Sequence, residues 1–106
     1  MKKYEFTGET KILLNGPILN RIRATARIEC ACGVVNVGDL GGWIENEKNL
    51  SHDGNAWVSG DARVYGNAWV SGDARVYGNA WVSGDAWVSG DARVYGNAWV
   101  YGNACV

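Results

Sequence analysis

From Gly54 onward, apolar and polar positions alternate within a unit of six residues. Each complete unit reads Ala, Trp or Arg, Val, Ser or Tyr, Gly, and then Asn or Asp. Valine recurs at every sixth position from Val58 to Val106. The alternation predicts short strands with Ala and Val on one face and the variable residues on the other. The Gly-Asp or Gly-Asn pair is typical of a turn, because both positions tolerate a positive φ.

Two arrangements of such strands are possible. An antiparallel meander would offer only Ala and Val from one face of a flat sheet. In a triangular coil, three units make one turn, every valine points to a central axis, and coils stack about 4.8 Å apart. Burial of each valine then stabilises the fold by roughly 1.5–3 kcal/mol. We therefore predict an all-β parallel β-helix of about four triangular coils, and the six-residue period favours the left-handed form.

The solenoid is predicted to span residues 37–106. Ile44 and Leu50 continue the spacing of six upstream, and His52-Asp53 then interrupts it by two residues before Val58. We interpret this interruption as a bulge at a corner.

Residues 1–36 are predicted to form an N-terminal β-hairpin cap. Lys11 to Leu14 and Ile18 to Ile28 are expected to be two strands around a turn at Asn15-Gly16-Pro17. Such a hairpin would cover the strand edges that the first coil otherwise exposes. The alternative is that this segment is an independent binding module.

The unit resembles the hexapeptide repeat of left-handed β-helix proteins, of which trimeric acyltransferases are the best-known members. More narrowly, Lys3 to Phe6, Leu19 to Ala24 and Gly38 to Ile44 resemble the leader of small bacterial and prophage proteins with such repeats. That group is known mainly under transferase-like or polymer-forming names. In the enzymes glycine usually follows the inward aliphatic residue directly, whereas Ser or Tyr intervenes here. The enzymes also use a histidine on a coil and a loop that shapes a coenzyme A cleft, and neither is found in this sequence.

Positions three units apart are predicted to stack on one side of the prism. Side one carries Trp57, Arg75 and Arg93, with Ser59, Tyr77 and Tyr95 beside them. Side two carries Arg63, Trp81 and Trp99, with Tyr65, Ser83 and Tyr101. Side three carries Trp69, Ser71, Trp87, Ser89 and Cys105. Side three lacks arginine and tyrosine because the unit Gly84 to Ser89 breaks the alternation of Trp and Arg units. We expect side three to be a flat apolar stripe and a protein interface.

The last coil is the second candidate contact surface. An uncapped coil is an open strand edge, so we expect self-association there, as a dimer through the C-terminal coil or as a trimer. The residues expected at this end are Trp99, Val100, Tyr101, Asn103 and Val106. The alternative is that the sequence belongs to a longer array of repeats.

Charge and cysteine content narrow the function classes. The net charge is −1, and residues 1–29 carry six Lys or Arg against three Glu. No surface is basic enough to predict nucleic-acid binding, and no apolar run is long enough to span a membrane. The three cysteines, Cys30, Cys32 and Cys105, favour reduced thiols in the cytoplasm. A zinc site needs three or four ligands, so no metal or other cofactor is expected.

Catalysis is not expected. The only histidine is His52, beside Ser51 and Asp53. Neighbouring residues of an extended strand point to opposite faces, so these three are not expected to form a nucleophile–base relay.

We expect a non-enzymatic interaction protein. The resemblance to prophage proteins implies one that inhibits or sequesters a bacterial defence protein or enzyme. A self-assembling scaffold and a degenerate acyltransferase are the alternatives, and exposed tryptophans also leave carbohydrate binding open.

Overall fold

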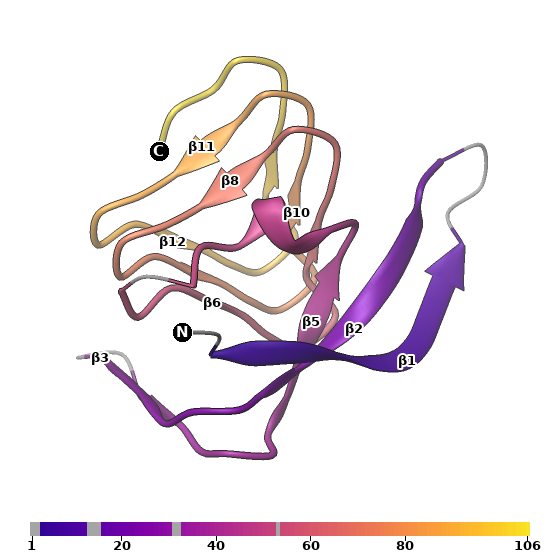
Figure 1. Ribbon diagram of the computed structural model, residues 1–106. Helices are drawn as coiled ribbons and strands as arrows, with labels where there is room; N and C mark the ends of the chain where they lie inside the picture. Colours follow the sequence, from indigo (N-terminus) through magenta and orange to yellow (C-terminus); the bar gives the residue numbers. More distant parts are fainter. Residues whose placement is uncertain (1–2, 13–15, 31–32, 53) are drawn as a thin grey trace.

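The repeat region forms the stacked coils of a parallel β-solenoid in the computed structural model, which describes residues 3–12, 16–30, 33–52 and 54–106 (Figure 1). Each unit contributes one two-residue strand. These strands are β6 (Trp57–Val58), β7 (Arg63–Val64), β8 (Trp69–Val70), β9 (Arg75–Val76), β10 (Trp81–Val82), β11 (Trp87–Val88), β12 (Arg93–Val94) and β13 (Trp99–Val100). Paired strands are separated by three units of the repeat, as in the pairing of Trp69 with Trp87. This register confirms the predicted three-sided coil, while the predicted left-handedness stays a prediction.

The core is a ladder of small aliphatic side chains along the axis of the prism. The valines from Val58 to Val88 are fully buried, and so are the alanines from Ala56 to Ala86. Because Ala and Val alternate with outward residues, each unit from Ala56 to Val88 buries its two small apolar side chains, while the last units are more exposed. The fold therefore follows directly from the six-residue pattern.

The first coil is two residues longer than the others. Ile44 pairs with Val64, and Leu50 pairs with Val70, whereas the same valines pair one coil later with Val82 and Val88. The predicted two-residue interruption is confirmed by this register, although Asp53 itself lies outside the described residues. Within this coil, the 3₁₀ turn η1 (Glu47–Asn49) follows β5 (Leu40–Ile44).

An N-terminal hairpin closes one edge of the first coil. The strands β1 (Tyr4–Ile12) and β2 (Ile18–Ala24) pair antiparallel, and β2 then pairs antiparallel with β5. A single sheet in the order β1-β2-β5-β7-β10-β13 therefore continues from the hairpin into the solenoid. The first strand begins at Tyr4, earlier than the predicted start at Lys11, because β2 offers partners as far as Ala24.

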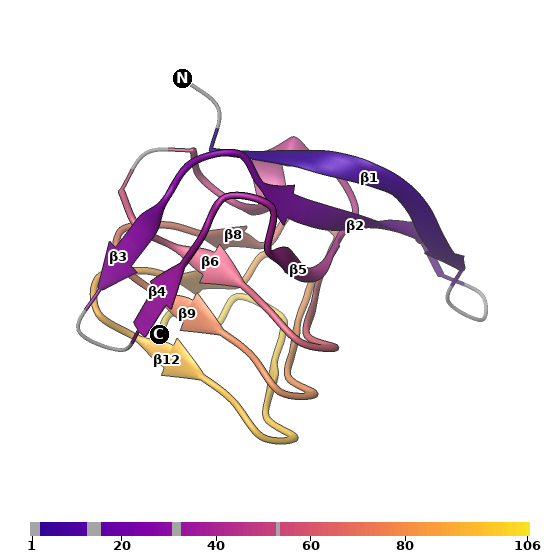
Figure 2. The ribbon, with the colours of Figure 1, turned by 90° about the horizontal axis from the view of Figure 1, so that it is seen from below.

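A second hairpin lies beside β6 and β9, and the sequence did not predict it (Figure 2). It consists of β3 (Ile28–Cys30) and β4 (Gly33–Val35). Ile28 and Val35 are buried and join the hydrophobic core. Strands of three residues give too short a pattern to recognise, and packing against the first coil stabilises them.

The corners of the prism carry ladders of amide and carboxylate side chains. The Asn55 amide donates to Asp73 Oδ1 at 3.3 Å, and the Asn67 amide donates to Asp85 Oδ1 at 3.2 Å. Asn and Asp units alternate along much of the repeat, so an amide often lies over a carboxylate of the next coil. This order keeps most carboxylates from stacking on one another.

Glycine is needed at the corners for two separable reasons. Gly72 has φ +65°, and a Cβ there would lie 2.9 Å from the backbone nitrogen of Gly90. Gly90 has φ +62°, but nothing lies within 4 Å of its Cβ position.

Gly72→Ala is expected to lower the free energy of unfolding by about 2–3 kcal/mol, because the left-handed conformation costs about 1–2 kcal/mol and the clash adds to it. Gly90→Ala should lose only the free energy that the left-handed conformation costs. If urea titrations showed equal losses of stability for the two variants, the close contact between coils at Gly72 would not contribute to stability.

Candidate functional site

The three sides of the prism carry different outward residues. Side one is formed by β6, β9 and β12, side two by β5, β7, β10 and β13, and side three by β8 and β11. Like residues stack on like in the later coils: Arg75 pairs with Arg93, Trp81 with Trp99, and Trp69 with Trp87. The predicted assignment of residues to sides is therefore confirmed.

One repeat unit causes this segregation. Trp and Arg units alternate, so their pattern recurs at every second unit, whereas a coil contains three units. Strict alternation would therefore place Arg over Trp on every side. The unit containing Trp87 is a second consecutive Trp unit and shifts every later unit by one place. The surface consequently separates into an arginine–tyrosine side and a tryptophan side that has neither arginine nor tyrosine.

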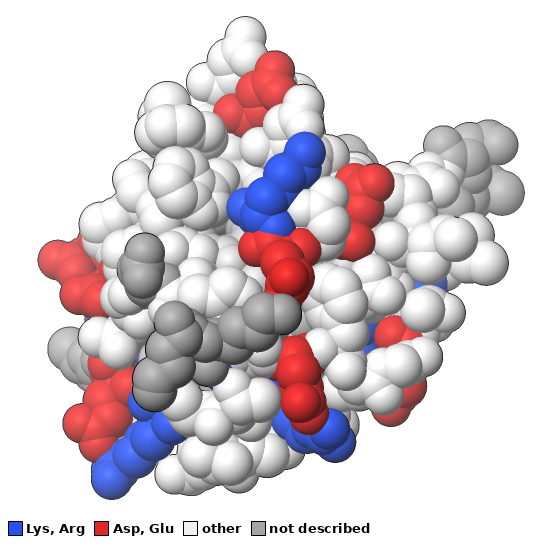
Figure 3. All heavy atoms as spheres, in the orientation of Figure 1, with Lys and Arg blue, Asp and Glu red and all other residues white. Residues whose placement is uncertain are grey.

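Side three presents two exposed indole rings. The rings of Trp69 and Trp87 lie 5.1 Å apart at an interplanar angle of 85°. Their exposed fractions are 38% and 50%, and the surface over β8 and β11 is mostly uncharged (Figure 3). The expectation of a flat stripe is corrected here, because edge-to-face packing turns one ring across the other. The two rings instead form an angled apolar wall.

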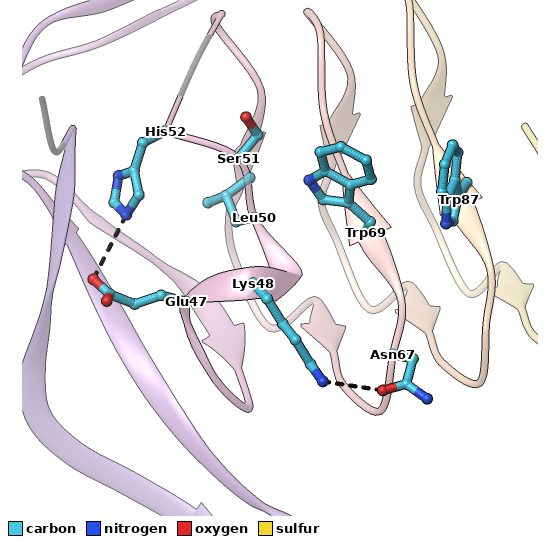
Figure 4. A pocket seen from close by; sticks show the side chains of 8 residues that line it. All are labelled: Glu47, Lys48, Leu50, Ser51, His52, Asn67, Trp69 and Trp87. Carbon is cyan, nitrogen blue, oxygen red and sulfur yellow. Dashed lines mark hydrogen bonds and ion pairs between the residues drawn. The ribbon is translucent and has the colours of Figure 1, made fainter.

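A groove of about 440 Å³ runs from this wall to the first coil. Its other lining residues come from η1, from the segment after it and from the corner before β8: Glu47, Lys48, Leu50, Ser51, His52 and Asn67. Figure 4 shows the Lys48 side chain extending toward Asn67, where Nζ lies 3.0 Å from Oδ1. The groove therefore combines an apolar wall with a rim that carries both charges.

His52 is held in place at the far end of the groove. Its ring stacks on Tyr4 with centroids 4.0 Å apart, and its Nδ1 accepts a hydrogen bond from the Lys3 backbone N–H at 3.2 Å. Its Nε2 lies 3.6 Å from Glu47 Oε1. The Ser51 hydroxyl and the His52 ring point in different directions (Figure 4). One ring nitrogen thus faces Lys3 in the N-terminal segment, and the other faces Glu47 in the first coil.

Asn49 replaces backbone donors that the first coil lacks. In later coils, backbone N–H groups donate to the next coil, as Trp69 does to the Ala86 oxygen. The η1 turn diverts the Asn49 N–H to the Asn46 oxygen. The buried Asn49 amide instead donates to the oxygens of Gly66 and Ala68, at 3.2 and 2.9 Å. This side chain joins the η1 turn to the second coil.

The residues expected to self-associate lie on and after β13. Trp99 is 65% exposed and stacks on Trp81 at 5.2 Å with an angle of 6°. Val100 is partly buried against the core, while Tyr101, Asn103 and Val106 are exposed. Cys105 is exposed, and its backbone forms an isolated parallel β-bridge with Trp87 on side three. The role of these residues in self-association stays a prediction.

Sequence reasoning found Trp69 and Trp87 but missed the first-coil half of the groove. Glu47, Lys48 and Asn67 were not singled out, because they belong to a non-repeating turn and a corner. The available signal was the widened spacing from Leu50 to Val58, which marks where the first coil departs from the prism.

The described ranges hold no candidate metal centre. No group of three or more His, Cys, Asp or Glu side chains is arranged to hold a metal ion there. Cys32 and the Cys30 side chain lie outside the described residues, so the Cys30/Cys32 pair remains untested. No helix in the described part of the chain has the length and apolarity to cross a membrane.

The fold defines a β-solenoid repeat protein. The family model described as the YdcK beta solenoid repeat matches residues 56–72, 68–84, 74–90, 86–102 and 92–106. These overlapping matches cover the region whose strands build the parallel coils. No curated protein matches the chain.

Proposed function

We propose that this protein is a non-enzymatic β-solenoid interaction protein that binds another protein through side three. The observation that carries the proposal is the exposed, perpendicular pair Trp69 and Trp87 beside the groove. Tryptophan is enriched among residues that dominate binding energy, and it contributes most in pockets that become dry on binding. The two rings are large, and β8 and β11 hold their backbones in fixed register.

The chemistry of the groove limits the kind of partner. An apolar side chain of a partner would pack against the indole corner, and polar groups around it would meet Glu47 and Lys48 on the rim. This is the usual arrangement of an interface, with an apolar centre and a polar edge. Side three carries tryptophan with neither arginine nor tyrosine, which supports a dedicated binding face, since a strict alternation of units would have placed an arginine beside Trp69.

We further propose a bacterial or phage-related setting in the cytoplasm, in which binding inhibits or sequesters a defence protein or enzyme. This part rests on the resemblance of the leader and repeats to small prophage proteins. Catalysis is not part of the proposal, because the geometry of His52 supports a structural role: its two ring nitrogens face Lys3 and Glu47.

A self-assembling scaffold is the second candidate function. The exposed Trp99 stacks on Trp81 with Tyr101 beside it, and this second aromatic surface on side two favours the scaffold. The two candidates differ in stoichiometry. A binding protein forms a complex of fixed composition, whereas a scaffold grows with concentration.

The test is capture of a partner from bacterial lysate, followed by measurement of the dissociation constant with the purified partner. Trp69→Ser/Trp87→Ser is expected to weaken binding at least tenfold, because each exposed aromatic anchor contributes about 1–2 kcal/mol. Trp99→Ser is the matched control, since it removes an exposed indole from side two. Circular dichroism should show that all variants remain folded.

Two results would contradict the proposal. One is a partner whose affinity is unchanged in the double variant. The other is a failure to capture any protein except the chain itself, in species whose mass by light scattering increases with concentration. The second result favours the scaffold.

A further inference from the structure

Side one contains a cleft that the proposed interface does not use. It measures about 340 Å³ and is lined by Ser59, Arg75, Tyr77 and Arg93. Arg75 and Arg93 lie on β9 and β12, and Ser59 and Tyr77 lie just after the stacked strands β6 and β9 (Figure 2). Three successive coils therefore contribute to one site.

Two arginines of neighbouring parallel strands line this cleft. Arg75 and Arg93 are directly paired residues of neighbouring strands, whose backbones lie about 4.8 Å apart. Arg75 is only 9% exposed, and burial together with the charge of Arg93 lowers its pKa. The stacking concentrates positive charge on side one, whereas Arg63 on side two lies over the Trp81 ring, 4.9 Å from its centroid.

The nearby carboxylates do not line the cleft. Asp73 and Asp91 lie at the corner two residues before each arginine. Asp39 lies in the loop before β5 and lines an adjoining cleft, which shares Ser59 and Arg75 with this one. Asp73 accepts a hydrogen bond from the Asn55 amide, and Asp39 accepts one from the Asn36 backbone N–H. The four residues that line the cleft therefore carry two positive charges and no negative charge.

Neutral donors and a ring surface complete the cleft. Ser59 and Tyr77 each bring a hydroxyl that can donate to an anion. The Tyr77 ring stacks on Tyr95 with centroids 5.3 Å apart and an angle of 10°. This flat pair offers a surface for an organic group attached to the anion.

We propose that the cleft of Ser59, Arg75, Tyr77 and Arg93 binds the phosphate group of a phosphate monoester or of free phosphate. A phosphate dianion matches the two guanidinium charges, and its oxygens accept from planar arginine donors and hydroxyls together. A carboxylate carries one charge and two oxygens, so it satisfies fewer of these donors. The phosphate could belong to a small molecule or to a phosphorylated side chain of a protein, and the same four residues would recognise either.

The test is calorimetric titration at low ionic strength with inorganic phosphate, phenyl phosphate, a phosphotyrosine peptide and acetate. Binding of phosphate is expected, with at least a tenfold loss of affinity in Arg93→Gln. Arg93 is exposed, so this variant should fold normally. Arg63→Gln is the matched control, because it removes an arginine from the same position of a unit on side two.

The ligands distinguish the sources of the phosphate. Tightest binding of phenyl phosphate supports a small aromatic monoester against the tyrosine pair, and tightest binding of the peptide supports a phosphorylated protein. Unchanged phosphate affinity in Arg93→Gln, an equal loss in Arg63→Gln, or acetate binding as tight as phosphate would each overturn the proposal. The outcome is independent of side three, since Trp69→Ser/Trp87→Ser should leave phosphate binding intact.

Discussion

Replacing Asn49 with alanine is expected to lower the free energy of unfolding by about 3–5 kcal/mol, because buried polar groups left without partners cost about 1–3 kcal/mol each. The Asn49 side chain is fully buried and makes hydrogen bonds in two directions. Its Oδ1 accepts from the backbone of Glu45 and Asn46, at 3.1 and 2.9 Å. Its amide donates to the carbonyl oxygens of Gly66 and Ala68. Alanine would leave these carbonyls buried beneath the first coil.

The measurement is urea unfolding followed by circular dichroism. Asn49→Asp is expected to be nearly as unstable as the alanine variant, because it keeps the acceptor but turns a carboxylate oxygen toward two carbonyl oxygens. Asn97→Ala is the control at an exposed corner, where a loss below about 0.5 kcal/mol is expected. If Asn49→Asp retained wild-type stability, the two donated bonds would not be the stabilising element.

The second large effect is expected at Tyr4, the most deeply packed residue of the N-terminal strand. Its ring is fully buried between His52 and Trp57, with centroids 4.0 and 6.4 Å away. Its hydroxyl oxygen lies 2.7 Å from the Leu50 carbonyl oxygen and 2.9 Å from that of Glu47. Tyr4→Ala should cost about 3–5 kcal/mol, as aromatic truncations in cores do. Tyr4→Phe should cost about 1–2 kcal/mol, since it removes only the hydroxyl. Phe6→Ala, on the exposed side of β1, is the comparison that should change little.

The same residue predicts an alkaline limit to stability. Burial, followed by the charge of Glu47, raises the pKa of Tyr4 well above its usual value near 10. A raised pKa in the folded state means that this contribution is complete below pH 10 and is lost as the pH rises further. Near pH 11 the free energy of unfolding should fall by up to about 1.4 kcal/mol per pH unit from this residue. The difference between wild type and Tyr4→Phe isolates this slope from the titration of lysines. Parallel pH profiles for the two proteins would contradict the assignment.

Much of the architecture is predictable because it is local and periodic. The recurrence of valine at every sixth position determines that three units close a coil and that each backbone pairs with the unit one full coil away. Once that register is known, the side of every outward residue follows by arithmetic, including the stacking of Arg75 on Arg93. The interruption between Leu50 and Val58 was also visible as a change of spacing. The strands β3 and β4 were harder to predict from the sequence, because they are very short.

The candidate site also has a part that the repeat predicts and a part that it does not. Trp69 and Trp87 could be placed on one side from the repeat alone, since their separation is one coil. The perpendicular arrangement of their rings was not predictable, because side-chain torsions depend on the packing around them. Glu47, Lys48 and His52 join the groove only because the longer first coil directs them toward side three.

The sequence by itself therefore determined the solenoid, its register and the division of residues among its sides, because a repeated unit satisfies its backbone hydrogen bonds in the same way each time. The tertiary structure decided how the repeat is closed at its first coil. There Tyr4 reaches Leu50 from the far end of the chain's N-terminal segment, and Asn49 supplies donors that the turn removed. Such contacts involve non-repeating residues far apart in the chain, and only close packing in three dimensions selects them.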